Sequence, residues 1–93
     1  MQQKLLRYVD KGDVFMEQKI KSIISSVLDM EISLILNENI SPDNIQEWDS
    51  MNHLIIITAL EEEFHVSFTP EQIEEMYKGF NNIRDILLCL IGE

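Results

Sequence analysis

The chain has 93 residues, 45% of them hydrophobic, which is enough for one small domain with one modest core and excludes a second domain. Its formal net charge is −10, and between positions 22 and 77 it has no Lys or Arg against twelve Asp or Glu. This sign excludes nucleic acid and anionic lipid surfaces as partners and indicates proteins with basic patches.

Residues 1–15 are the least regular part of the sequence. Three apolar residues, Leu5, Leu6 and Val9, stand at loosely helical spacing before a break at 11–13. No apolar run resembles a signal peptide or a membrane span, so we expect a cytoplasmic protein. We treat 1–15 as an N-terminal extension of unassigned order and 16–92 as the domain.

The first predicted helix spans 16–29, where apolar residues recur with the period of one helix face: Ile20, Ile23, Ile24, Val27 and Leu28. Residues 30–49 lack a sustained period and are rich in turn formers. We expect a long ordered loop across the core, with a short helical turn after Pro42. Its expected apolar anchors are Ile32, Leu34, Leu36, Ile40, Ile45 and Trp48.

The second predicted helix spans 50–64, with Asp49 or Ser50 as its N-cap. Placing residues at 100° intervals puts Met51 and Ile55 on an outward face as an apolar pair. The same phase puts Leu54 on the edge of an inward arc, where it is expected to line the core or a cavity with Ile57 and Leu60. The core face itself is predicted to hold His53, Ile56, Ile57, Leu60 and Phe64.

The third predicted helix is short and starts at Pro70, because Thr69 is an N-cap and Gln72 completes a capping box. Gly79 is expected to end it, and Tyr77 and Phe80 are expected to cover the core. The inward residues of this helix are predicted to be Ile73, Met76 and Tyr77.

The last helix is predicted to start with a cap at Asn81 or Asn82 and to end near Ile91. Its core face is expected to hold Ile83, Ile86, Leu87 and Leu90. Cys89 is the one cysteine, so it forms neither an internal disulfide nor a metal cluster, and we expect it to be a small buried side chain. Four helices without a strand signal predict an all-α fold, a small asymmetric four-helix bundle.

Ser50 admits three interpretations. It is an N-cap without chemistry, a hydrolytic nucleophile with His53 and Asp49, or a site modified by another enzyme. The second is disfavoured because His53 falls on the core side and no glycine-rich oxyanion loop accompanies it.

The third interpretation has support from a resemblance. The run 47–54, EWDSMNHL, resembles the phosphopantetheine attachment motif of acyl carrier proteins, in which an Asp-Ser-Leu triplet opens the second helix. The run 59–64, ALEEEF, resembles the acidic end of that helix. The resemblance covers about 16–91 and implies an acyl-carrier-type bundle with a long loop after the first helix and a short third helix.

By this resemblance, a phosphopantetheinyl transferase attaches 4'-phosphopantetheine from coenzyme A to Ser50, with Asp49 recognised as part of the motif. The chain is then no enzyme but a carrier of acyl or aminoacyl groups as thioesters, expected to be monomeric, metal-free and not membrane-bound. Its partners are the transferase and loading and processing enzymes with basic patches, which contact Met51, Ile55 and Glu62.

The sequence also departs from the family pattern. Met51 replaces the usual leucine, a volume-conserving change that is expected to preserve recognition. Asn52 and Ile55 stand where carriers of fatty acid synthesis have acidic residues, and Trp48 stands before the Asp where a small or aliphatic residue is common. The departures at Asn52, Ile55 and Trp48 indicate a specialised pathway. The alternative function is an acidic four-helix interaction domain in which Ser50 only caps a helix.

Overall fold

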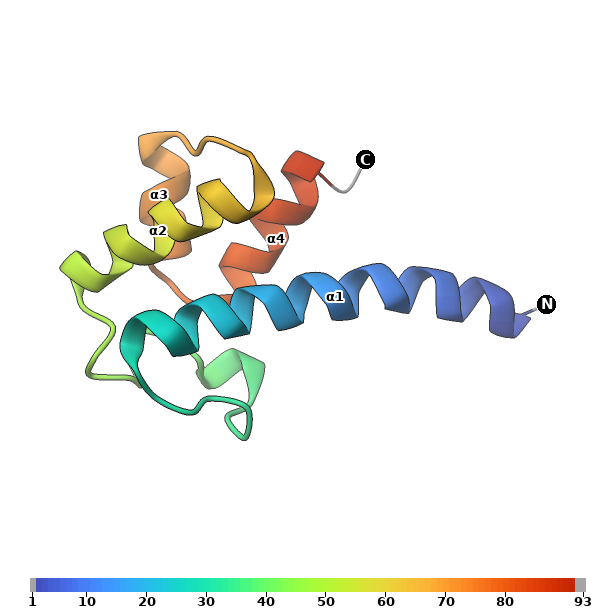
Figure 1. The fold of residues 1–93 in the computed structure, drawn as a ribbon, viewed down its shortest axis with the longest axis horizontal. Coiled ribbons are helices and arrows are strands. Elements are labelled where there is room, and N and C mark those ends of the chain that lie inside the picture. Colours follow the sequence, from blue (N-terminus) through green and yellow to red (C-terminus); the bar gives the residue numbers. More distant parts are fainter. Residues whose placement is uncertain (1, 92–93) are drawn as a thin grey trace.

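The computed structural model describes the backbone of residues 2–91 and the side chains of residues 14–91. This part of the chain contains four α-helices and no strand (Figure 1). The α-helices are α1 (Gln2–Leu28), α2 (Ser50–Phe64), α3 (Pro70–Met76) and α4 (Phe80–Ile91), with one 3₁₀ turn, η1 (Asn37–Asn39), between α1 and α2. The predicted all-α bundle, its long loop and its short third helix are confirmed. Every helix described is too short or too polar to span a bilayer.

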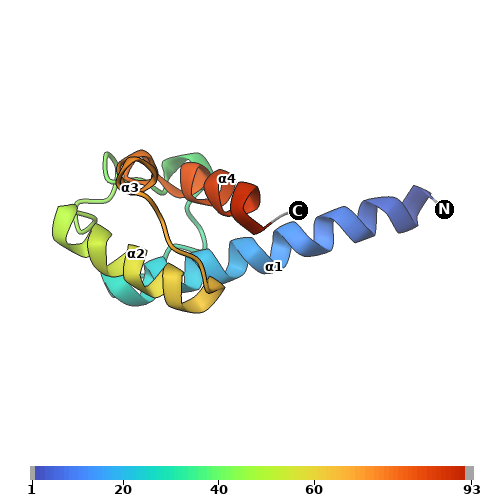
Figure 2. The same cartoon turned by 90° about the horizontal axis from the view of Figure 1, so that it is seen from above.

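Helix α1 is longer than predicted, because it begins at Gln2 and continues through the expected break at 11–13. A single glycine inside a helix costs only about 1 kcal/mol relative to alanine, so it does not by itself end a helix. Figures 1 and 2 show the first half of α1 extending beyond the other helices, while its second half packs beside α2 and α4. The division between 1–15 and 16–92 stays a prediction.

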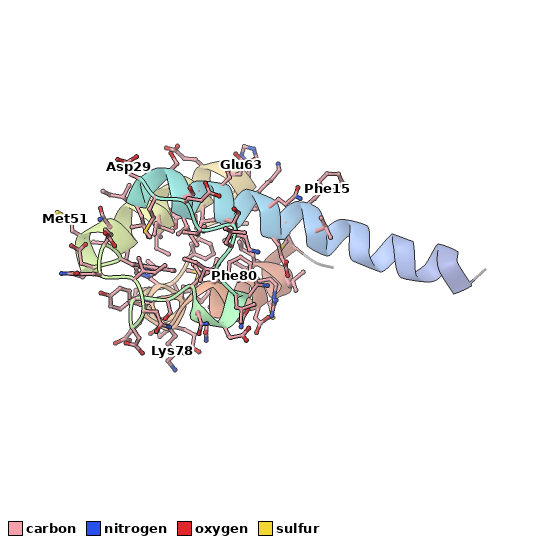
Figure 3. The ribbon with its side chains drawn as sticks, turned by 90° about the horizontal axis from the view of Figure 1, so that it is seen from below. Phe15, Asp29, Met51, Glu63, Lys78 and Phe80 are labelled. Atoms are coloured by element: carbon pink, nitrogen blue, oxygen red, sulfur yellow. The ribbon has the colours of Figure 1, made fainter. Side chains whose placement is uncertain are left out.

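The core lies between the second half of α1 and the other three helices. Figure 3 shows Phe80 in this interior, and the side chain is fully buried, as expected of a residue that covers the core. Lys21 Nζ and the Arg84 guanidinium lie 5.3 Å and 5.9 Å from the centre of its ring. The fully buried large side chains are Ile20, Ile24, Ile32, Ile40, Trp48, Ile56, Leu60, Met76, Phe80, Ile83 and Leu87.

The loop between α1 and α2 is ordered and contributes Ile32, Ile40, Ile45 and Trp48 to the core. A single turn follows Pro42 as predicted, closed by the bond from Ile45 N to Ser41 O at 2.9 Å. The predicted burial is wrong for two of the six expected anchors of this loop.

Leu34 and Leu36 are the two exceptions, with 93% and 62% of their surfaces exposed. Both belong to the stretch that leads into η1, which itself buries no residue. The presence of apolar residues along the loop therefore overestimates how closely this part of it follows the core.

Helix α3 has the predicted capping box, in which Thr69 Oγ1 accepts from Gln72 N at 3.1 Å and the Gln72 side chain accepts from Thr69 N at 2.9 Å. Helix α4 begins at Phe80 rather than after Asn81 or Asn82. The reason is tertiary: Phe80 is buried, and its N–H donates to Ile40 O at 2.8 Å.

The end of α4 also differs from the prediction. Cys89 is exposed and Leu90 is 38% exposed, although both were expected in the core. Ile91 is 40% exposed. The exposure of three successive residues shows that the last turn of α4 extends past the core.

Candidate functional site

Ser50 is the first residue of α2 and is exposed. The N-cap is Asp49, whose Oδ1 accepts from Asn52 N at 2.9 Å. The Asn52 side chain donates in turn to Glu47 O at 2.8 Å. Asp49 thus satisfies one of the free N–H groups at the helix terminus, and among the described residues the Ser50 hydroxyl has no hydrogen-bond partner.

His53 lies one turn along α2 from Ser50 and is buried, with 4% of its surface exposed, as predicted for the core face. Its Nδ1 accepts a hydrogen bond from Trp48 Nε1 at 3.1 Å, and its Nε2 lies 2.8 Å from Ile73 O. An indole N–H only donates and a carbonyl only accepts, so the neutral ring must hold its proton on Nε2. Burial lowers the pKa of His53, and its bond to Ile73 O opposes this lowering.

The Ile73 carbonyl is available to His53 because α3 ends in a tight turn. Tyr77 N donates to Glu74 O at 3.1 Å instead of to the carbonyl four residues earlier. The last carbonyls of a helix lack partners within the helix, and a side chain from α2 satisfies this one. His53 therefore links the helix that starts at Ser50 to the end of α3.

The hydrolytic interpretation of Ser50 does not fit this geometry. A serine nucleophile needs a histidine nitrogen that can take its proton. Both ring nitrogens of His53 are already bonded, to Trp48 and to Ile73. His53 is therefore a buried structural residue here and no base for Ser50.

A groove of about 370 Å³ runs between α2 and α3 beside Ser50. The His53 and Tyr77 rings form part of its wall, with their centroids 4.7 Å apart. The groove is lined by Ser50, His53, Leu54, Pro70, Ile73, Glu74 and Tyr77. An apolar lining with a few polar groups beside an exposed hydroxyl suits a ligand attached at that hydroxyl.

The outward face of α2 is apolar near Ser50. Met51 is 72% and Ile55 is 50% exposed, as their helical phase predicts. Leu54 is 56% exposed, so the expectation that it lies inward with Ile57 and Leu60 is wrong. Figure 3 shows Met51 at the periphery, at the end of the bundle away from the projecting half of α1.

Three glutamates end α2, and their carboxylates have different roles. Glu61 Oε2 accepts from Phe68 N at 2.9 Å, within the turn toward α3. Glu63 pairs with Lys19 at 2.8 Å, which lowers the pKa of its carboxyl. Glu62 is exposed and has no ion pair among the described side chains, and it lies along the same face of α2 as Met51 and Ile55.

The link from Trp48 through His53 to Ile73 was not predicted. A buried indole and a buried imidazole both require hydrogen-bond partners, and that requirement is the one signal in the sequence. It does not identify the partners, because the Ile73 carbonyl becomes available only through the tight end of α3.

No family model and no solved structure gives a match to this chain. One curated protein does: an acyl carrier protein of Buchnera aphidicola subsp. Schizaphis graminum (strain Sg) is 37% identical over 60 residues. The matched residues cover 64% of this chain and 75% of that protein. This level of identity, over three quarters of the relative, shows that the two proteins belong to the same family.

Proposed function

Because this chain belongs to the acyl carrier protein family, we propose that Ser50 bears a 4'-phosphopantetheine arm transferred from coenzyme A by a phosphopantetheinyl transferase. The attached arm supplies a terminal thiol that holds acyl or aminoacyl groups as thioesters. The chain itself then binds and presents these groups and leaves catalysis to its partner enzymes.

The residues at the start of α2 fit a phosphate ester. The Ser50 hydroxyl is exposed, and Asp49 already caps the helix, so modification of the hydroxyl breaks no hydrogen bond described in the structure. A helix N-terminus favours negative charge through its N–H groups and dipole. The same serine lines the groove between α2 and α3. The exposed, unbonded hydroxyl at the first helical position is the observation on which this proposal rests.

Intact mass measurement tests the attachment site. Incubation with coenzyme A and a broad-specificity transferase is expected to add the mass of one phosphopantetheinyl group to the parent chain and nothing to Ser50→Ala. Ser50 is not the N-cap, so the alanine variant is expected to unfold within a few degrees of the parent.

Ser67→Ala is the matched control, because Ser67 is exposed and lies outside the helices. It is expected to gain the arm at the parent rate. A folded parent chain that gains no mass would refute the carrier proposal and leave the alternative, an acidic interaction domain.

The docking surface proposed for partner enzymes consists of Met51, Ile55 and Glu62 on the outward face of α2. Apolar exposure beside one unpaired carboxylate suits weak, salt-sensitive contact with a basic patch. Glu62→Gln is expected to raise the KM of the transferase for this chain about two- to fivefold at low salt, as for an exposed ion pair of about 0.5–1 kcal/mol. The difference is expected to disappear at high salt.

Glu71→Gln is the control for this test, since Glu71 is exposed in the first turn of α3, away from the outward face of α2. It removes the same charge and is expected to leave KM unchanged. An equal effect of both variants would mean that only net charge matters and would remove Glu62 from the docking surface.

We further infer a specialised biosynthetic pathway in the cytoplasm. Asn52 bonds to Glu47 O and Ile55 is an exposed apolar side chain, so neither contributes negative charge near Ser50. The mass of the loaded chain isolated from its own cell would identify the carried group, and a saturated fatty acyl series would contradict this inference.

A further inference from the structure

The hydrogen bonds of His53 join residues on both sides of Ser50. Trp48 precedes the serine by two positions and is 1% exposed, and its indole donates to His53 Nδ1 at 3.1 Å. His53 follows by three positions and donates through Nε2 to Ile73 O at 2.8 Å. One side chain thus connects the end of the loop, the first turn of α2 and the end of α3.

Helix α3 depends on this connection more than a longer helix would. It has seven residues, and isolated helices of that length are unstable in water. Among the described hydrogen bonds, His53 to Ile73 is the one that joins a side chain of α2 to α3. Loss of the imidazole would leave the buried Trp48 N–H and the partly buried Ile73 carbonyl without their partners, which is costly above all for the indole.

We propose that His53 is a positioning residue for the modification of Ser50. Through Trp48 and Ile73 it holds the start of α2 and the adjoining wall of the α2–α3 groove in the arrangement that the transferase binds. This inference rests on the proposed function. It follows from the requirement that a transferred group and its acceptor oxygen be aligned closely, because a displacement of about 1 Å can lower a rate by as much as about 10²-fold.

Transfer kinetics with varied concentrations of the full chain test the proposal. His53→Gln keeps an acceptor and a donor at the end of the side chain, whereas His53→Leu keeps burial and removes both. His53→Leu is expected to lower kcat/KM at least tenfold, and His53→Gln is expected to restore it to within threefold of the parent. Trp48→Phe, which removes the indole donor, is expected to give an intermediate loss.

Leu87→Ala is the control for general destabilisation, because Leu87 is fully buried in α4 and does not line the groove at Ser50. Its thermal midpoint is expected to fall while kcat/KM at a temperature where it is folded stays at the parent value. A loss of kcat/KM in Leu87→Ala equal to that in His53→Leu would overturn the positioning role.

The remaining outcomes are also decisive. A folded His53→Leu chain with the parent kcat/KM would overturn the role of His53 and leave the carrier function intact. If His53→Leu does not fold, an unchanged kcat/KM in Trp48→Phe overturns the proposal and a several-fold loss supports it. A parent chain that gains no arm would overturn the proposed function itself, which separates the two failures.

Discussion

His53 is a polar residue that the fold tolerates in its core because both ring nitrogens have partners. The protonated ring would have N–H groups at both positions, and its Nδ1–H would face the Trp48 indole N–H. Two donors cannot bond to each other, so the native state favours the neutral ring. This agrees with the direction of the pKa shift of His53, which burial lowers below 6.5.

Folding stability is expected to depend on pH through His53. Its pKa is lower in the folded chain than the unfolded value of 6.5, so the unfolded chain binds more protons between these two values. The stability from the neutral ring is complete above about pH 6.5 and is lost as the pH falls toward the lowered pKa. Urea unfolding midpoints measured from pH 7.5 to 5 are expected to decrease.

His53→Gln is the control for this prediction, because its side chain does not titrate while His65 and all the carboxylates remain. Subtracting the pH dependence of its unfolding midpoint from that of the parent isolates the contribution of His53 to stability. The Glu63 carboxyl, whose pKa the Lys19 ion pair lowers, affects stability only below the ordinary carboxyl range. Parallel curves for the two proteins would contradict the prediction.

At the scale of residues, the sequence predicts burial better than it predicts partners. Helical phase correctly placed His53 inward and Met51 outward. It did not show that Ile73 O is the partner of His53, since that bond depends on where α3 ends. It also placed Leu54 inward, because phase measures an angle on one helix and does not show how far the neighbouring helix covers it.

At the scale of elements, the boundaries set by local chemistry were predictable. The start of α2 follows from Asp49 and the start of α3 from the capping box of Thr69, both within four residues of sequence. The start of α4 was not predictable, because it depends on Phe80 reaching Ile40 from forty positions away. Gly12 failed to break α1 since a single glycine penalty is small.

Gly79, between α3 and α4, is expected to resist substitution. Its φ is +142°, and a Cβ there would lie 3.0 Å from both Ile40 O and Ser41 Cβ. Gly79→Ala is expected to destabilise the fold by about 1–3 kcal/mol, because the backbone conformation is strained for an L-residue and the carbonyl oxygen cannot rotate away. Thermal or urea unfolding measures the loss.

Combining Gly79→Ala with Ser41→Gly separates the backbone strain at position 79 from the close contact between the two Cβ atoms. Ser41→Gly removes the Ser41 Cβ contact and leaves the Gly79 φ and the Ile40 carbonyl in place. It also removes the hydrogen bond from Asn44 Nδ2 to Ser41 Oγ, and the Ser41→Gly single variant measures that loss. A double-mutant cycle is expected to show partial recovery, smaller than the original loss. A Gly79→Ala chain as stable as the parent would show that the junction adjusts without cost.

At the scale of the whole molecule, α1 connects to both of the long helices beside it. Lys19 pairs with Glu63 of α2 at 2.8 Å, and Arg84 of α4 pairs with Glu17 at 3.2 Å. These pairs are partly or largely exposed and contribute little stability by themselves. Their effect is on charge: they neutralise Glu17 on α1 and Glu63 at the end of α2, whereas Glu62 on the outward face of α2 has no ion pair among the described side chains.

The exposure of Cys89 has a consequence for how molecules of this protein join under oxidation. It is the one thiol in the sequence. Each unmodified chain can therefore form one intermolecular disulfide, so these chains join only as dimers. An arm on Ser50 adds a second thiol, so each modified chain can form two intermolecular disulfides and the chains can join as linear polymers. Non-reducing electrophoresis is expected to show a ladder for the modified chain and dimers alone for modified Cys89→Ser, so the pattern of bands reports which thiols each molecule has.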